Sequence, residues 1–199
     1  NAQKKLKALQ KKGQKISPVV ISGRTIAHTF WGKGWCNHLE RYSDFENRLP
    51  RGRTYVRNGS VVDLQIEEGK VTAKVSGSEL YQVDVKIKTL AKKKWNDVVT
   101  KCSGQIDSLI ELLEGNLSQG VMKVITDPAE GLFPSPKEIS FECSCPDWAS
   151  MCKHVAATLY GVGARLDVEP ALLFRLRRAD HRELFSEISK NVLAAPAVS

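Results

Sequence analysis

The 199-residue sequence lacks several features that would place it in common functional classes. It has no run of about 18 apolar residues and no segment ordered like a signal peptide, so neither a membrane-spanning nor a secreted protein is expected. It has no internal repeat and no Gly-rich phosphate loop, which argues against nucleotide binding by the chain itself. Paired carboxylates and a nucleophile elbow in a suitable context are also missing, so we do not expect an enzyme.

Cysteines are few and unevenly spread. Of the five, Cys36 and Cys102 are isolated, whereas the other three lie within ten residues of one another with a histidine beside the last. An odd count with this clustering favours metal binding over a disulfide framework and indicates a reducing cytoplasm. The two isolated cysteines are predicted to be small, buried apolar side chains.

Acidic residues are scarce in the first half of the chain. The net charge is +8, and residues 1–100 hold 20 of the 30 Lys and Arg residues but only 9 of the 22 Asp and Glu. A basic half joined to a mildly acidic half predicts that the first half faces a polyanion.

The most basic segment is the predicted arm, residues 1–20. It carries six lysines and no acidic residue, and Gly13 interrupts any helix there. A disordered or weakly helical arm of this kind attracts phosphates without regard to sequence, although a merely solubilising tail is the alternative. The contacts expected from the arm are Lys4, Lys5, Lys11 and Lys12.

A second basic segment follows a predicted helix over residues 35–49, which Pro50 and Gly52 should end. Guanidinium groups match phosphate geometry and an aromatic ring can stack on a base, so this turn is the second predicted nucleic-acid contact. The alternative is that its arginines pair with Glu40, Asp44 and Glu46. Trp31 and Trp35 are expected in the core rather than on a stacking platform. The predicted contact residues are Arg48, Arg51, Arg53, Tyr55 and Arg57.

Hydrophobic periodicity predicts an α+β fold with a small antiparallel sheet. Alternation with period two indicates strands over residues 61–67, 71–76 and 81–87, joined by tight turns, and a short strand over 139–143. Helical spacing indicates helices over 90–100, 105–113, 117–124, 153–166 and 170–176, and a last helix from 180 to about 192.

The strongest motif is a Cys-x-Cys pair followed, after six residues, by Cys-x-His: Cys143, Cys145, Cys152 and His154. Three thiolates and one imidazole fill a tetrahedral zinc shell and leave no position for water, so the predicted site is structural rather than catalytic. The alternatives are a redox pair, which would leave the histidine unused, a Cys152–His154 nucleophilic couple, and ordinary buried cysteines.

This spacing resembles the SWIM zinc finger, whose four ligands Cys143, Cys145, Cys152 and His154 match one for one. Phe141, Trp148 and the VAATLY run after His154 resemble its apolar positions, and residues 29–66 resemble the N-terminal region of bacterial SWIM finger proteins. The resemblance implies a finger with C-terminal helices over residues 131–199, preceded by an α+β region over 21–130. It also implies nucleic-acid or protein binding without enzymatic activity.

These observations together predict a zinc-binding accessory protein of the cytoplasm that binds DNA or structured RNA, including ribosomal RNA. A Swi/Snf-type helicase-like ATPase is the protein partner that the resemblance implies. The alternative function is a protein-interaction adaptor built on a structural zinc finger. Around the finger Glu142 and Asp147 oppose Lys153 and Arg165, so nucleic-acid contact is expected from the arm and the arginine turn instead.

Overall fold

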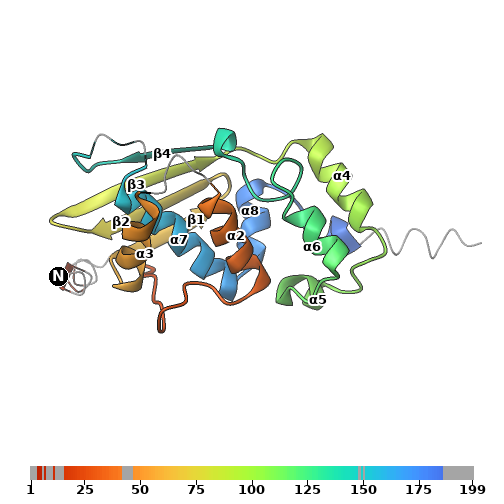
Figure 1. The fold of residues 1–199 in the computed structure, drawn as a ribbon, viewed down its shortest axis with the longest axis horizontal. Helices are drawn as coiled ribbons and strands as arrows, with labels where there is room; N and C mark the ends of the chain where they lie inside the picture. Colours follow the sequence, from red (N-terminus) through yellow and green to blue (C-terminus); the bar gives the residue numbers. More distant parts are fainter. Residues whose placement is uncertain are drawn as a thin grey trace, which may run out of the picture.

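The computed structural model describes residues 4, 5, 7, 11, 16–41, 47–147, 149 and 151–185, and it has the predicted α+β fold. Four antiparallel strands in the order β1-β2-β3-β4 form one sheet, and helices pack beneath it (Figure 1). Three further helices, α4, α5 and α6, lie together at the end of the molecule away from α3. No helix among the described residues combines the length and apolar character needed to cross a membrane.

The sheet confirms the predicted strands to within one residue. Its strands are β1 (Val61–Glu67), β2 (Lys70–Ser76), β3 (Leu80–Ile87) and β4 (Ile139–Cys143). Gly69 makes the β1–β2 turn with a positive φ of 66°, a conformation that glycine adopts without strain. In β3, Tyr81, Val83, Val85 and Ile87 are buried and their neighbours are not, as expected for a sheet with one face on the core.

Seven helices and a 3-10 turn are the other described elements. They follow the predicted order, although the predicted ends differ by a few residues, as is usual where helix ends are set by caps. The last predicted helix extends mostly beyond the described residues. The elements are α2 (Phe30–Glu40), α3 (Leu49–Arg57), α4 (Lys92–Cys102), α5 (Leu109–Glu114), α6 (Gln119–Ile125), η2 (Pro136–Glu138), α7 (Lys153–Val168) and α8 (Ala171–Arg177).

The prediction of one helix over residues 35–49, ended by Pro50, was wrong. Helix α2 begins at Phe30, where the Thr29 side chain caps it, and it ends at Glu40. Pro50 lies in the first turn of α3, where the missing N–H is not needed, so this proline starts a helix instead of ending one. The arginine-rich segment is therefore helical rather than a turn.

Helix α7 lies at the centre of the molecule and packs against α2, α3 and the sheet. It is apolar on nearly all sides, and 11 of its 16 residues are buried, which is the pattern of a helix enclosed by its neighbours. Small residues allow close contact: a Cβ on Gly52 of α3 would lie only 2.5 Å from the Cβ of Ala156. This contact explains why Gly52 occurs within a helix.

The buried apolar side chains form one cluster, whose members occur along the chain between Val19 and Leu184. Trp31 and Trp35 belong to it, as predicted, and their indole nitrogens donate to the carbonyls of Leu112 and Leu159. The cluster takes side chains from both sides of the predicted boundary between residues 21–130 and 131–199. That division stays a prediction.

Candidate metal centre

Two elements deliver the four candidate ligands. Cys143 ends β4, paired with Val83 of β3, and the Ser144 N–H continues this pairing by donating to the carbonyl of Gln82. The chain then turns at Cys145. Cys152 is the N-cap residue of α7 and His154 is its second residue, so the helix start returns these two side chains to the cluster.

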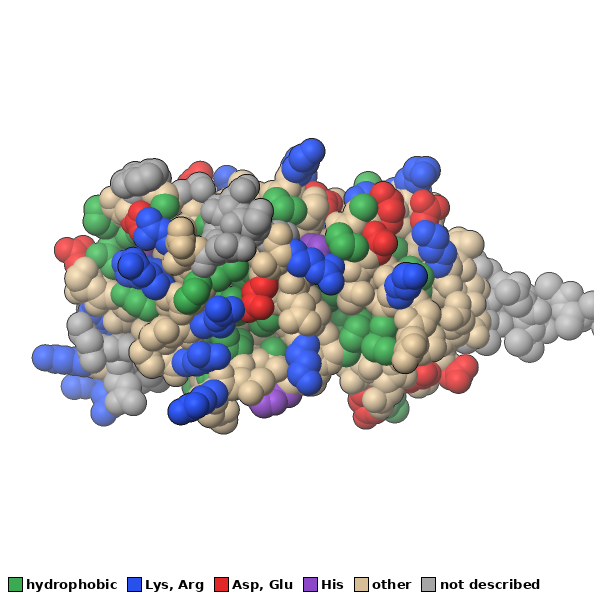
Figure 2. Space-filling model, viewed as in Figure 1, with side chains coloured by type: hydrophobic (Ala, Val, Ile, Leu, Met, Phe, Trp, Pro, Cys, Tyr) green, Lys and Arg blue, Asp and Glu red, His purple; other side chains and the backbone are tan. Residues whose placement is uncertain are grey.

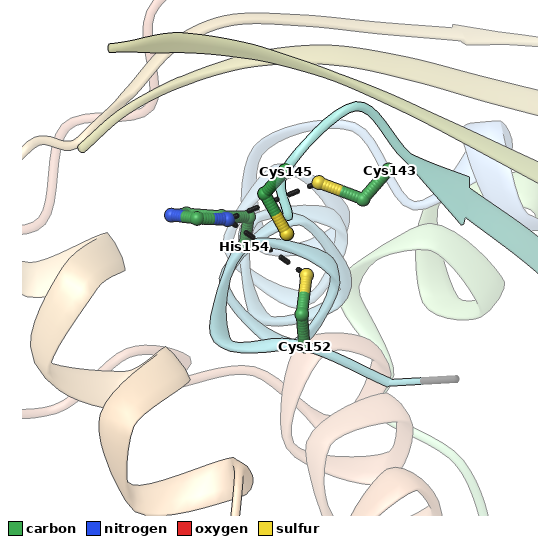
Figure 3. A group of neighbouring side chains, drawn as sticks. All are labelled: Cys143, Cys145, Cys152 and His154. Carbon is green, nitrogen blue, oxygen red and sulfur yellow. Dashed lines mark hydrogen bonds between the residues drawn. The ribbon is translucent and has the colours of Figure 1, made fainter. Parts of the chain in front are cut away.

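The ligand atoms face one another, as Figure 3 shows. One potential ligand atom from each residue lies within 4.8 Å of the other three. The Sγ atoms of Cys143 and Cys152 are each 3.8 Å from Nδ1 of His154. Zinc bonds of about 2.3 Å to sulfur and about 2.0 Å to nitrogen place the donors at tetrahedral corners about 3.5 to 3.8 Å apart. The group therefore has the donors and close to the spacing of a tetrahedral Cys3His site, with Nδ1 as the imidazole ligand.

The electrostatics of the cluster favour one thiolate at the helix start. The hydrogen bond from Cys143 lowers the pKa of the Cys152 thiol, and contacts with His154 and the Val155 N–H act in the same direction. The same bond to Cys152, together with burial, raises the pKa of Cys143. The first turn of a helix also stabilises negative charge. A zinc ion bound here would displace the protons of the ligand thiols, because thiolates are the ligands of zinc.

Aromatic rings fix the orientation of His154, which is buried. Tyr81 stacks on the imidazole with ring centroids 4.4 Å apart, and Tyr55 meets it edge-on at 5.4 Å. The Nε2 atom has no hydrogen-bond partner among the described residues. It faces Gly77, where a Cβ would lie 3.1 Å from Nε2 and 2.9 Å from the Tyr81 ring. Glycine at position 77 therefore leaves the space that the imidazole and Tyr81 occupy.

The loop between the two ligand pairs is tied to the start of α3. Arg48 forms an ion pair of 3.2 Å with Asp147, and a second bond of 3.3 Å joins the same two groups. Asp147 also accepts from the Ala149 N–H, a local bond two residues along the chain. The Arg48 side chain is thus partly buried beside the metal centre, with its charge paired to Asp147.

The other residues of the predicted arginine contact fall into two groups. Arg53 pairs with Glu40 at 2.6 Å, as the carboxylate alternative expects, and the Tyr55 ring contacts His154. Arg51 and Arg57 are exposed and have no ion-pair partner among the described residues. Among the four arginines of this segment, these two are both exposed and without a carboxylate partner in the described part of the chain.

The predicted arm is only partly described. Lys4 and Lys11 are exposed, whereas Lys12 lies outside the described residues. Lys5 donates from Nζ to the carbonyls of Gly77 and Ser78, at 3.0 and 3.2 Å. The same glycine faces His154, so Lys5 lies at the edge of the metal centre.

Two cationic residues that sequence reasoning missed, Arg24 and Lys33, are exposed on the same face as Arg57. Arg24 belongs to no charge run or motif, and Lys33 lies between Trp31 and Trp35, for which the sequence favours a core position over a stacking platform. Cys36 and Cys102 are buried as predicted, and burial raises the pKa of their thiols to about 12 and about 11. Both are neutral side chains of the core.

No protein-family model matches the chain. No solved structure shows significant similarity to it. A protein of Mycobacterium tuberculosis (strain ATCC 25618 / H37Rv), described as uncharacterized protein Rv2102, is 34% identical over 167 residues. The match covers 82% of this chain and 60% of the relative, so the chain spans about three fifths of the length of that protein.

Proposed function

We propose that this protein is a zinc-dependent accessory factor that binds DNA or structured RNA, including ribosomal RNA, through a basic face beside a closed Cys3His site. Thiolate and imidazole are the donors that structural zinc prefers, and four protein ligands leave no position for a reacting water. The zinc has a structural role in this proposal, and the protein is not an enzyme. Its place of action is the reducing cytoplasm, where the cysteines stay available for metal.

One observation carries the nucleic-acid part of the proposal. Lys and Arg side chains run across the face that carries α2 and α3, with few acidic side chains among them (Figure 2). Arg24, Lys33, Arg51 and Arg57 are exposed there without a carboxylate partner among the described residues. A group of exposed cations with few carboxylates among them gives this face a positive potential, which attracts a polyanion.

The metal centre would act as a rigid support for this face. Arg48 ties its loop to α3, and Tyr55 of the same helix contacts His154. Metal binding would thereby fix the helix that carries Arg51 and Arg57. The finger is also free to hold a protein partner, for which a Swi/Snf-type helicase-like ATPase is the candidate that the SWIM resemblance suggests.

A second function, a protein-interaction adaptor, is favoured by a specific observation. Arg48 and Arg53, two of the four arginines predicted to contact phosphate, are neutralised by Asp147 and Glu40. An adaptor needs the metal centre but no phosphate contacts, so its basic charge would serve solubility alone.

A salt series with labelled DNA and RNA hairpins separates the two functions. With about four phosphate contacts, affinity should fall about 100-fold between about 50 and about 200 mM salt, with little sequence preference. The Cys145→Ser variant, which loses one ligand, should lose zinc by metal analysis and bind more weakly, whereas Cys102→Ala should match the parent protein. Absence of binding by the zinc-loaded protein at the lowest salt would leave the adaptor function.

A further inference from the structure

We propose that a hollow of about 350 Å³ beside α2 and α3 holds one backbone phosphate of the nucleic acid. This inference rests on the proposed function and gives it a location. The hollow lies between the segment 24–27 and the helices α2, α3 and α7, and it is separate from the four metal ligands. Its cationic lining residues are Arg24, Lys33, Arg53 and Arg57.

The charge of the lining favours an anion. Four cationic side chains face the hollow against the single carboxylate of Glu40. That carboxylate accepts through Oε1 from Arg53 at 2.6 Å and from the Tyr160 hydroxyl at 2.8 Å, so it offsets the charge of Arg53 and leaves three further cations. Arg24, Lys33 and Arg57 have no ion pair among the described residues, so their charges are available to a ligand.

Arg53 is held ready in one orientation. Its Nη1 bonds to Glu40 and, at 3.1 Å, to the Tyr160 hydroxyl, while the guanidinium lies 5.8 Å from the centre of the Tyr160 ring. Burial and the bond to Glu40 raise the pKa of Tyr160, so its hydroxyl stays protonated and keeps donating. These contacts use Nη1, and among the described residues Nη2 and Nε are left to donate to a phosphate oxygen.

The segment that carries Arg24 is anchored on both sides. Before it, the Val19 N–H donates to Val61 of β1. After it, the Thr29 N–H and hydroxyl donate to Asp167 of α7, at 3.0 and 2.7 Å. Holding a short segment at both ends lowers the entropy lost when a ligand binds, so this side of the hollow is preorganised.

The chemistry of the lining fits a phosphate better than a base. Tyr160 is the aromatic residue of the lining, and it is buried, with the Arg53 guanidinium 5.8 Å from the ring centre, so its ring is not available for stacking. Burial raises the pKa of Cys36 to about 12, which makes it a neutral thiol in the lining and not a nucleophile. Thr25 and Asn37 add uncharged hydrogen-bonding groups. A lining of cations and uncharged hydrogen-bonding groups, without a surface for stacking, binds a phosphate group irrespective of the base sequence.

The test compares two double variants with the same change in charge. Arg24→Gln/Arg57→Gln removes two cations from the hollow, and Lys92→Gln/Lys123→Gln removes two exposed cations from α4 and α6. Binding of a fluorescent RNA hairpin and its DNA counterpart is measured by anisotropy across a salt series. The hollow variant should bind about tenfold more weakly at low salt, and its salt slope should be smaller by about 1, the effect of one lost phosphate contact. The control should keep the parent slope.

Other outcomes are informative in different ways. Equal salt slopes for the parent and both variants would overturn the assignment of a phosphate to the hollow but would leave nucleic-acid binding intact. If the parent protein binds neither RNA nor DNA at low salt, the proposed function fails. The proposal that the hollow holds a nucleic-acid phosphate then fails with it. In that case a thermal shift with inorganic pyrophosphate, present in the parent and absent in Arg24→Gln/Arg57→Gln, would assign the hollow to small phosphates instead.

Discussion

At the scale of single residues, His154 shows how the surroundings of a ligand are set by residues outside the motif. Nδ1 faces the thiols, Tyr81 stacks on the ring and Gly77 leaves space beside Nε2. Neither Gly77 nor Tyr81 is close to the motif in sequence, since both belong to the β2–β3 hairpin. They would affect a bound metal through the orientation of the imidazole.

Gly77→Ala should therefore weaken zinc binding without removing a ligand. Its Cβ would press on the Tyr81 ring at 2.9 Å and on Nε2 of His154 at 3.1 Å, and rings stacked at 4.4 Å cannot both move freely. We expect affinity for zinc to fall about tenfold in competition with a chromophoric chelator, as for other changes in the shell around ligands.

Gly120→Ala is the matched control, because the nearest side-chain atom to its Cβ would be 3.4 Å away, an ordinary contact. Unchanged zinc affinity in Gly77→Ala would mean that the imidazole is not held by this packing.

At the scale of elements, α8 is joined to the strand that delivers Cys143. Arg177 of α8 is fully buried and donates at 2.7 Å both to the Lys88 carbonyl and to Glu138, the residue directly before β4. Burial opposes ionisation of Glu138, but the hydrogen bonds from Arg177 and Ser135 outweigh it and lower the pKa of this carboxyl. The start of β4 is thus fixed by an ion pair in which Arg177 is fully buried and Glu138 is partly exposed.

Glu138→Gln should destabilise the protein in a pH-dependent way. Because the folded-state pKa of Glu138 lies below its ordinary value of 4.5, the stabilisation is present above about pH 4.5 and is lost as pH falls through the folded-state pKa. At neutral pH the variant leaves the Arg177 charge buried without its partner, which costs about 3 kcal/mol. Chemical denaturation at several pH values should show that the difference in unfolding free energy between variant and parent becomes smaller below about pH 4.5.

Glu142 of β4 is exposed and supplies the control for this experiment, since Glu142→Gln should track the parent at every pH. The difference in unfolding free energy between Glu138→Gln and the parent cannot stay constant down to acid pH if the ion pair is its source. A constant difference would show that the ion pair does not provide this stability.

At the scale of the whole molecule, the metal centre adjoins an extensive core, to which its ligand Cys152 belongs. Val19 to Leu184 contribute to one buried cluster, and three of the four strands precede the ligand motif. Small zinc fingers unfold without metal because they have little other core, but this chain has an extensive one. The metal is therefore expected to order one region rather than the entire fold.

Removal of zinc with a strong chelator should leave far-ultraviolet circular dichroism largely intact. Hydrogen exchange should speed up in residues 141–156, in α3 and in the β2–β3 turn that packs on His154, while β1 and the centre of α7 stay protected. Readdition of zinc should restore the protection. Cooperative loss of all secondary structure on chelation would show instead that metal binding is coupled to folding of the whole chain.

The sequence by itself determined the local features: the four strands, the order of the helices and the metal-ligand group. Period-two alternation and turn glycines act between neighbouring residues, and the four ligands lie within twelve positions, so each could be inferred without tertiary contacts. Pro50 was misread because a proline is compatible with the end of one helix and with the first turn of the next.

Only the tertiary structure decided which charges are free. Arg48 reaches Asp147 across 99 positions, and Arg53 reaches Tyr160 across 107. Arg24 and Lys33, by contrast, meet Arg57 around one hollow although no motif links them. Whether a cation pairs internally or faces a ligand depends on distances between elements, and those are set by the packing of α7 against α2 and α3.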